Sequence, residues 1–274
     1  MSRIHASRMG RRTRVAMITM AMTATASAAH AQTDYYNTDA GRPITVEDAT
    51  PIERRAFELQ LAPLRLERSA GGRYSWGVEP EMAFGILPRT QIELAVPLAL
   101  IDAPTGRRAG LAGIELSALH NLNVETRIPA FAVAADLLLP VGGFAPARAY
   151  PSVKGIATRT FRWARFHANA QYTMGEAPAL DEEPTSELSR WLAGVAVDRA
   201  FPLRSLLVTA EVTTEQPMHD EEELEWSAAT GLRYQYSPRW AIDAGVGKRL
   251  TGTGGSWYLT FGSAYAFGLP WRGR

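Results

Sequence analysis

Hydrophobic and polar residues alternate with a period of two along most of the chain after residue 55. The clearest case is Tyr74–Leu100, where apolar residues occupy every second position on both sides of a turn at Pro88-Arg89-Thr90. Glu79, Glu81 and Glu93 stand at intervening positions. A period of two predicts β-strands with one apolar and one polar face. Each arm reaches the length of about 9–11 residues that a strand needs to cross a bilayer, so the pattern predicts a transmembrane hairpin.

The same alternation recurs to residue 267 and predicts about twelve antiparallel strands. A phase slip at Pro63 predicts a β-bulge there, because proline has no N–H to donate to a ladder. Connections after even-numbered strands are short, whereas most of those after odd-numbered strands, such as Asp102–Gly110, are longer and rich in Gly, Pro and charge. This alternation is typical of outer-membrane barrels, which have short periplasmic turns and long external loops. We therefore predict an all-β, up-and-down transmembrane β-barrel with both chain ends in the periplasm.

A soluble β-sandwich is the alternative architecture for this pattern. Slipping the Tyr74–Leu100 strands by one residue would move Glu79, Glu81 and Glu93 into hydrocarbon. A charge at the bilayer midplane costs up to about 4 kcal/mol, so the barrel reading specifies the register strongly. Aromatic residues near both strand ends also favour the barrel, because they predict two girdles at the membrane interfaces. The outer girdle contains Trp76, Trp191, Trp226 and Trp257, and the inner girdle contains Trp240, Tyr265 and Phe267.

The polar faces of the strands predict the lining of the lumen. The residues expected there are Glu79, Glu81, Glu93, Glu115, Asp136, His167, Asn169, Glu211, Arg233 and Asp243. Two further acids and three further bases follow from the strand phases, namely Glu58, Glu67, Arg65, Lys154 and Arg249. Carboxylates outnumber cationic groups in this set, and rings of carboxylates favour cations in a pore. We expect a cation-preferring lumen, with Glu79 and Glu81 at its constriction.

The N-terminus has the features of a secretory signal peptide. Five arginines without an acidic residue precede a mildly apolar run, and Ala29-His30-Ala31 is a small-x-small cleavage site. We therefore expect a signal peptide (1–31), a leader (32–55), a barrel (56–267) and a periplasmic C-terminal tail (268–274). The leader lacks any sustained period. It is either a periplasmic tail or a partial plug of the lumen, and the sequence leaves both alternatives open.

Composition narrows the possible partners and cofactors. Removing residues 1–31 changes the net charge from +1 to −4, which argues against nucleic acid as a partner. The chain contains no cysteine, which excludes disulfides and thiolate metal sites. We predict no metal site and no cofactor, since the acidic loops lack the fixed spacing of a calcium loop. After residue 31 the histidines are His120, His167 and His219, and none lies in a recognisable nucleophile motif. We therefore predict no catalytic site.

Two short stretches carry a resemblance to a known family. Residues 113–118 follow a loop, and residues 137–142 end a strand in Pro-Val-Gly. This arrangement resembles the outer-membrane β-barrels called phenol meta-pathway transport proteins. Ala112, Gly113 and Val141 depart from the residues that are frequent there. The resemblance implies a porin-like or uptake barrel in the bacterial outer membrane.

The sequence thus favours a porin-like channel or transporter for small solutes. A structural or adhesive closed barrel without transport is the first alternative, and a lipid-modifying enzyme of the outer membrane is the least favoured. The expected partners are outer-membrane lipid and lipopolysaccharide, the outer-membrane insertion machinery and small solutes. The insertion machinery commonly reads a terminal aromatic residue, whereas here Phe267 is followed by Gly268–Arg274.

Overall fold

The computed structural model describes residues 38–68, 73–103, 106–178, 188–219, 223–251 and 256–268. The predicted signal peptide and the tail after residue 268 lie outside the described residues, as do the acidic stretches 181–183 and 220–222. Within the described ranges, no helix is long and apolar enough to cross a membrane.

The described residues form fourteen β-strands, all in one sheet. These are β1 (Ala56–Arg68), β2 (Tyr74–Leu87), β3 (Thr90–Ala95), β4 (Leu98–Ala103), β5 (Gly106–Leu111), β6 (Ile114–Asn121), β7 (Ala130–Leu139), β8 (Tyr150–Thr160), β9 (Arg165–Thr173), β10 (Ser189–Ala200), β11 (Leu206–Pro217), β12 (Glu225–Ser237), β13 (Trp240–Arg249) and β14 (Trp257–Gly268).

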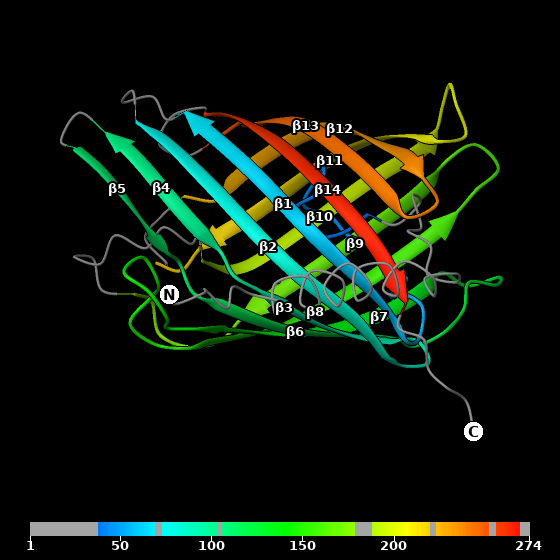
Figure 1. Ribbon diagram of the computed structural model, residues 1–274, viewed down its shortest axis with the longest axis horizontal. Helices are drawn as coiled ribbons and strands as arrows, with labels where there is room; N and C mark the ends of the chain where they lie inside the picture. Colours follow the sequence, from blue (N-terminus) through cyan, green and yellow to red (C-terminus); the bar gives the residue numbers. More distant parts are fainter. Residues whose placement is uncertain are drawn as a thin grey trace, which may run out of the picture.

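The sheet closes on itself, because β1 pairs antiparallel with both β2 and β14 (Figure 1). β2 pairs with β3 along one half and with β4 along the other, so β3 and β4 are two parts of one barrel strand. β5 and β6 likewise continue one another, and the barrel has twelve strands, as predicted. The interruption between β3 and β4 falls at Val96-Pro97, where the proline has no N–H to donate.

The predicted loop Asp102–Gly110 is wrong for most of its length. β4 and β5 pair in register from Leu98↔Leu111 to Ala103↔Gly106 and extend the barrel as a hairpin. A distant loop supports this hairpin: the Phe144 N–H donates to the Leu111 carbonyl at 3.0 Å, and the Phe144 ring packs with Ile101 and Ala112. Local sequence pattern carries no sign of that support. By contrast, the predicted bulge is confirmed by register shifts on both sides of β1, between Gln60 and Leu64 toward β14 and between Leu61 and Leu64 toward β2.

The apolar strand faces point outward and are exposed, as a barrel in lipid requires. Trp76, Trp226, Trp240, Trp257 and Tyr265 are exposed, whereas Trp191 and Phe267 are partly buried. The start of β1 and the end of β14 lie at the same end of the barrel as the short turns, here called the inner end (Figure 1). The Lys248 ammonium lies 5.3 Å from the Trp257 ring centroid near the opposite, outer end.

Candidate functional lumen

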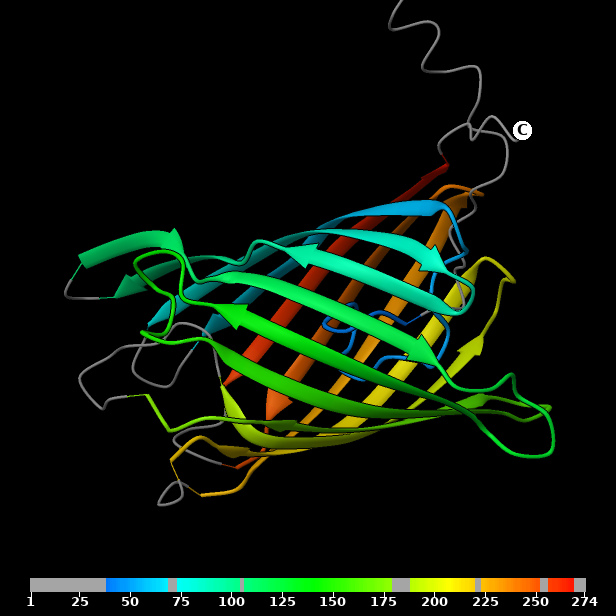
Figure 2. The same cartoon turned by 90° about the horizontal axis from the view of Figure 1, so that it is seen from below.

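Residues 38–55, here called the lumen segment, lie inside the barrel and not beside it (Figure 2). Arg42, Val46 and Ala49 have no exposed surface. The segment forms only two isolated bridges outside the named strands, Asp39↔Arg42 and Arg54↔Gly85. Most of its other contacts with the barrel are made through side chains of the barrel wall, so it is held without being part of the sheet.

The first group of contacts surrounds Arg42. Its guanidinium donates to Asp243 of β13 at 3.2 Å, pairs with Asp39 and lies 3.6 Å from the Glu58 carboxylate of β1. Arg233 of β12 donates to the same Asp39 at 2.8 Å. Burial alone would raise the pKa of Asp39, but Arg233 and Arg42 outweigh it and hold that pKa below its usual value. Asp39 is therefore ionised and bridges two arginines.

The second group satisfies backbone amides in the middle of the segment. Oε2 of the Glu211 carboxylate on β11 accepts the N–H groups of both Thr45 and Val46, each at 2.8 Å. Asn169 of β9 forms a reciprocal pair with Glu47, accepting its N–H at 2.8 Å and donating to its carbonyl at 2.9 Å. Wall side chains thus replace water for a backbone that has no strand partner there.

The third group lies near the inner end of the barrel. Thr158 of β8 accepts the Ala49 N–H at 3.0 Å, and Asn121 of β6 donates to the Ala49 carbonyl at 2.7 Å. Ala49 also packs in an apolar cluster with Leu119, Ala130, Ala132, Ala134 and Ile156. Gln91 of β3 accepts the Ile52 N–H at 2.6 Å. These contacts attach the segment to β3, β6 and β8.

Inward-facing glycines leave room for the segment. A Cβ at Gly194 would lie 2.6 Å from Cγ2 of Val46, and one at Gly231 would lie 2.5 Å from Cβ of Pro43. Real Cβ atoms do not approach that closely, so the absence of a side chain at both positions is what allows the segment to pack against β10 and β12.

We expect Gly231→Ala to destabilise the protein by about 1–3 kcal/mol, because the new methyl group overpacks against Pro43. Gly77→Ala is the matched control, since a Cβ there has no neighbour within 4 Å. The midpoint of thermal unfolding, followed by the gel shift of the folded barrel, measures the difference. Equal midpoints for the two variants would show that the segment does not press on β12.

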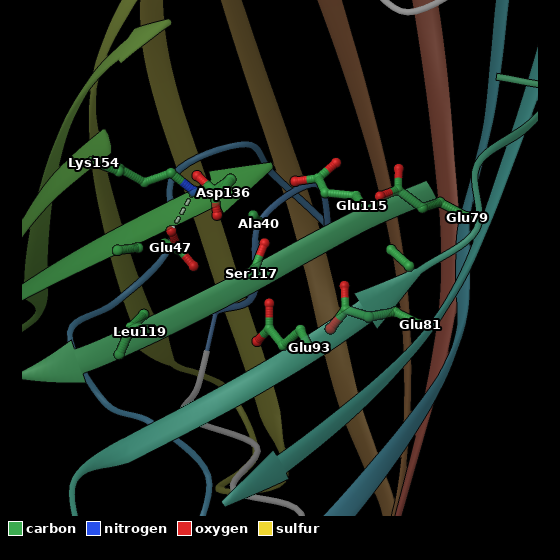
Figure 3. Close-up of a pocket in the computed structure, with 12 residues that line it drawn as sticks. Ala40, Glu47, Glu79, Glu81, Glu93, Glu115, Ser117, Leu119, Asp136 and Lys154 are labelled. Atoms are coloured by element: carbon green, nitrogen blue, oxygen red, sulfur yellow. Dashed lines mark hydrogen bonds and ion pairs between the residues drawn. The ribbon is translucent and has the colours of Figure 1, made fainter. Parts of the chain in front are cut away.

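Five carboxylates form a continuous acidic wall on adjacent strands. Glu79 and Glu81 lie on β2, Glu93 on β3, Glu115 on β6 and Asp136 on β7. All five line a cavity of about 70 Å³ between the wall and the lumen segment, and their side chains point into it (Figure 3).

One cation faces this wall. Lys154 of β8 also lines the cavity, and its ammonium donates to Glu47 of the lumen segment at 2.6 Å. The single lysine is therefore held by the segment, and carboxyl groups outnumber cationic groups among the residues that line this cavity.

A larger cavity of about 640 Å³ lies toward the outer end and is lined by residues such as Arg65, Arg73, Tyr150 and Leu188. Glu79, Glu115 and Asp136 line both cavities. The larger cavity, here called the outer vestibule, therefore borders the acidic wall. The lumen segment lies across the smaller cavity from that wall.

The predicted lumen residues fall into two groups. Glu79, Glu81, Glu93, Glu115 and Asp136 come together at the cavity, whereas Asn169, Glu211, Arg233 and Asp243 contact the lumen segment. Two charged residues were missed: Arg165 donates to Asp198 through two nitrogens at 3.0 and 2.8 Å. Both follow the inward phase of their strands, and that signal could have found them.

His167 lies in a buried polar chain next to this pair. Its Nε2 is 2.9 Å from Asp198 and its Nδ1 is 3.0 Å from the Thr158 hydroxyl. A hydroxyl, an imidazole and a carboxylate in this order form a catalytic triad, in which the imidazole is the base for the hydroxyl nucleophile. However, Thr158 is 5% exposed, accepts the Ala49 N–H and lines neither cavity described above. The chain of groups therefore positions the lumen segment.

Among the described residues, no group of three or more His, Asp or Glu has an arrangement that could hold a metal ion.

A closed antiparallel barrel with an apolar exterior and a charged lumen has the architecture of the bacterial outer-membrane channels. The protein is thus a β-barrel of the bacterial outer membrane. The family model described as "Putative MetA-pathway of phenol degradation" matches residues 70–267, and the chain belongs to this family.

Solved structures support the fold. An outer membrane channel from Pseudomonas putida F1 is 11% identical with a TM-score of 0.54, covering 84% of this chain and 100% of its own. The NanC porin is 8% identical with a TM-score of 0.52, covering 76% of this chain and 98% of its own. The KdgM porin is 12% identical with a TM-score of 0.50, covering 77% and 99%. A search of curated protein sequences finds no match.

Proposed function

We propose that the protein is a channel that lets small solutes cross the outer membrane and prefers cations. The acidic wall is the observation that carries this proposal. Its carboxylates are contributed by four strands, face a water-sized cavity and continue into the outer vestibule. Low-dielectric walls focus the field of such a cluster and raise the local concentration of cations.

The charge balance of the rest of the lumen supports the same preference. Arg65 lies 3.5 Å from Glu67, and Arg249 donates to Glu225 at 2.9 Å, so these cations act mainly on their own partners. Arg233 is paired with Asp39. Lys154 is the one base that lines the cavity of the acidic wall, and its nearest partner is Glu47.

The test is the reversal potential of the protein in a planar bilayer under a salt gradient. We expect the sign of a cation-preferring pore in the unmodified protein and a shift toward zero in Glu79→Gln with Glu81→Gln. Glu176→Gln is the control, because the Glu176 side chain is 83% exposed in a loop and pairs with Arg148 outside both cavities. Anion preference in the unmodified protein would contradict the role of the acidic wall.

The transported solute is a separate question. The family description names phenol degradation, so small aromatic compounds are the first solutes to test by liposome swelling. The outer vestibule offers apolar side chains such as Leu138 and Tyr150 beside its charged groups. Swelling rates that do not exceed those of protein-free liposomes would argue against this class of solute.

A closed structural barrel is the second candidate function, because the lumen segment fills much of the space behind the acidic wall. Conductance separates the two candidates. A channel conducts at least when the segment is removed, whereas a structural barrel is not required to conduct in either form.

A further inference from the structure

We infer that the lumen segment is a displaceable gate, held in the closed position by a latch that consists of Arg42 and its partners Asp243, Glu58 and Asp39. This inference rests on the proposed channel function, and it adds the conformational change by which the channel opens.

The way in which the segment is attached permits movement. Within the described residues its backbone pairs with the barrel only at the Arg54↔Gly85 bridge. Next to that bridge, the Arg55 N–H donates to the Gly85 carbonyl at 2.7 Å, and Ala56 then begins β1. Removing residues 38–53 from the lumen would therefore break no strand pairing of the barrel, and the segment would stay tethered at the inner end.

Many of the contacts that hold the segment are charged or polar, although Ile44, Val46 and Ala49 also pack in apolar clusters with wall residues. Each carboxylate, amide and guanidinium that the segment would leave behind is a group that water solvates well. A buried ion pair contributes little net stability, because its attraction is offset by the loss of hydration. Water can therefore replace the polar contacts in the open position, whereas the apolar packing of Ile44, Val46 and Ala49 favours the closed one.

Arg42 is the residue on which the closed position depends most. Its side chain has no exposed surface and it lies within 3.6 Å of carboxylates from two strands, Glu58 of β1 and Asp243 of β13, while also pairing with Asp39. If Arg42 is replaced by an apolar residue, Glu58 and Asp243 stay buried opposite a side chain that cannot pair with them. Leaving buried charges uncompensated is strongly unfavourable, whereas opening the gate hydrates them.

Lys154 connects the gate to the permeation path. In the closed position its ammonium is bound to Glu47 of the segment, beside the acidic wall. When the segment leaves, Lys154 loses Glu47, and Glu211 and Asn169 lose the backbone groups they hold. Opening therefore widens the lumen and also frees the Lys154 ammonium to pair with the carboxylates of the acidic wall.

The first test is a cross-link that prevents the movement. The chain contains no cysteine, so Val46→Cys with Gly194→Cys introduces the only two thiols. A Cβ at residue 194 would lie 2.6 Å from the Cγ2 position of residue 46, close to the spacing of about 3 Å between a Cβ and the partner sulfur in a disulfide. We expect the oxidised double variant to conduct about tenfold less than the same preparation after reduction. Each single cysteine variant should be indifferent to oxidant.

The second test weakens the latch. We expect Arg42→Met to raise the open fraction in planar bilayers by about a hundredfold, as loss of one partner of a buried ion pair implies. Arg107→Met is the control, because Arg107 is 79% exposed and pairs with Asp102 near the outer end. The gel shift on heating verifies that each variant has formed a barrel.

The outcomes separate the gate from the channel. Equal conductance of the cross-linked protein and the reduced double-cysteine protein would overturn the gate. An unchanged open fraction in Arg42→Met would overturn the latch. If Arg42→Met and a variant lacking the segment are both silent although folded, the proposed channel function itself fails. Cation-preferring current from the variant lacking the segment, together with indifference to the cross-link, would retain the channel and remove the gate.

Discussion

Deleting Thr33–Asp48 is expected to raise the single-channel conductance by about an order of magnitude, because it removes most of the lumen segment from a barrel of twelve strands. The deleted stretch carries Arg42 and the backbone groups that Glu211 and Asn169 hold. Those wall side chains become hydrated and line a wider pore. Planar-bilayer recordings of refolded protein measure the change directly.

The deletion spares the elements that assembly requires. The cleavage site at Ala29-His30-Ala31 and Gln32 remain, and the pairing of β1 with β14 begins only at Ala56. Deleting Pro184 and Thr185 is a suitable control for loop deletion in general, since both residues lie in the long connection between β9 and β10. Identical conductance with and without Thr33–Asp48 would mean that the segment does not obstruct the pore.

The sequence predicted the barrel well because each strand carries its own signal. Trp76, Leu94 and Ile242 each stand in a run of period two, and each is exposed on the outer face. The lipid selects one face of every strand independently, so a local pattern is sufficient. The strand break at Val96-Pro97 was not predicted, because the apolar alternation continues through it.

The position of the lumen segment has no comparable local signal. Ile44, Val46 and Ala49 follow neither a strand period nor a helix period. The segment is held by single side chains far away in the sequence, such as Gln91, which binds Ile52 at a separation of 39 residues, and Thr260, which binds Pro43 at a separation of 217. Sequence alone therefore favoured a periplasmic tail over a partial plug, and the three-dimensional contacts place the lumen segment inside the barrel.

Replacing Phe267 by alanine is expected to lower the yield of inserted barrel by about tenfold, whereas truncation after Phe267 leaves it unchanged. The Phe267 ring stacks on Phe57 of β1 at 5.4 Å, and Phe57 stacks on Phe84 of β2 at 4.4 Å. These three rings join the last strand to the first two, and their two contacts contribute about 1–3 kcal/mol. Truncation removes only one residue pair of the β1–β14 ladder, Ala56↔Gly268.

Outer-membrane fractionation with the gel shift of the folded barrel measures the inserted fraction. Phe161→Ala is the matched control, because Phe161 also lies at the inner end but packs edge-on against Phe166, away from the pairing of β1 with β14. If Phe267→Ala and the truncated chain insert equally well, the strand does not end functionally at Phe267. A loss that is as large for Phe161→Ala would point to a general need for aromatics at this end.

The lumen segment also constrains the order in which the protein folds. Arg42 contacts Asp243, which is 201 residues away, and the Pro43 carbonyl accepts from Thr260, which is 217 residues away. Contacts of such high sequence separation form late, because the intervening chain must first be ordered. The N-terminal stretch leaves the ribosome and crosses the inner membrane first, yet it can complete its contacts only after β13 and β14 are in place. The earliest part of the chain to be made is thus the last to reach its native position.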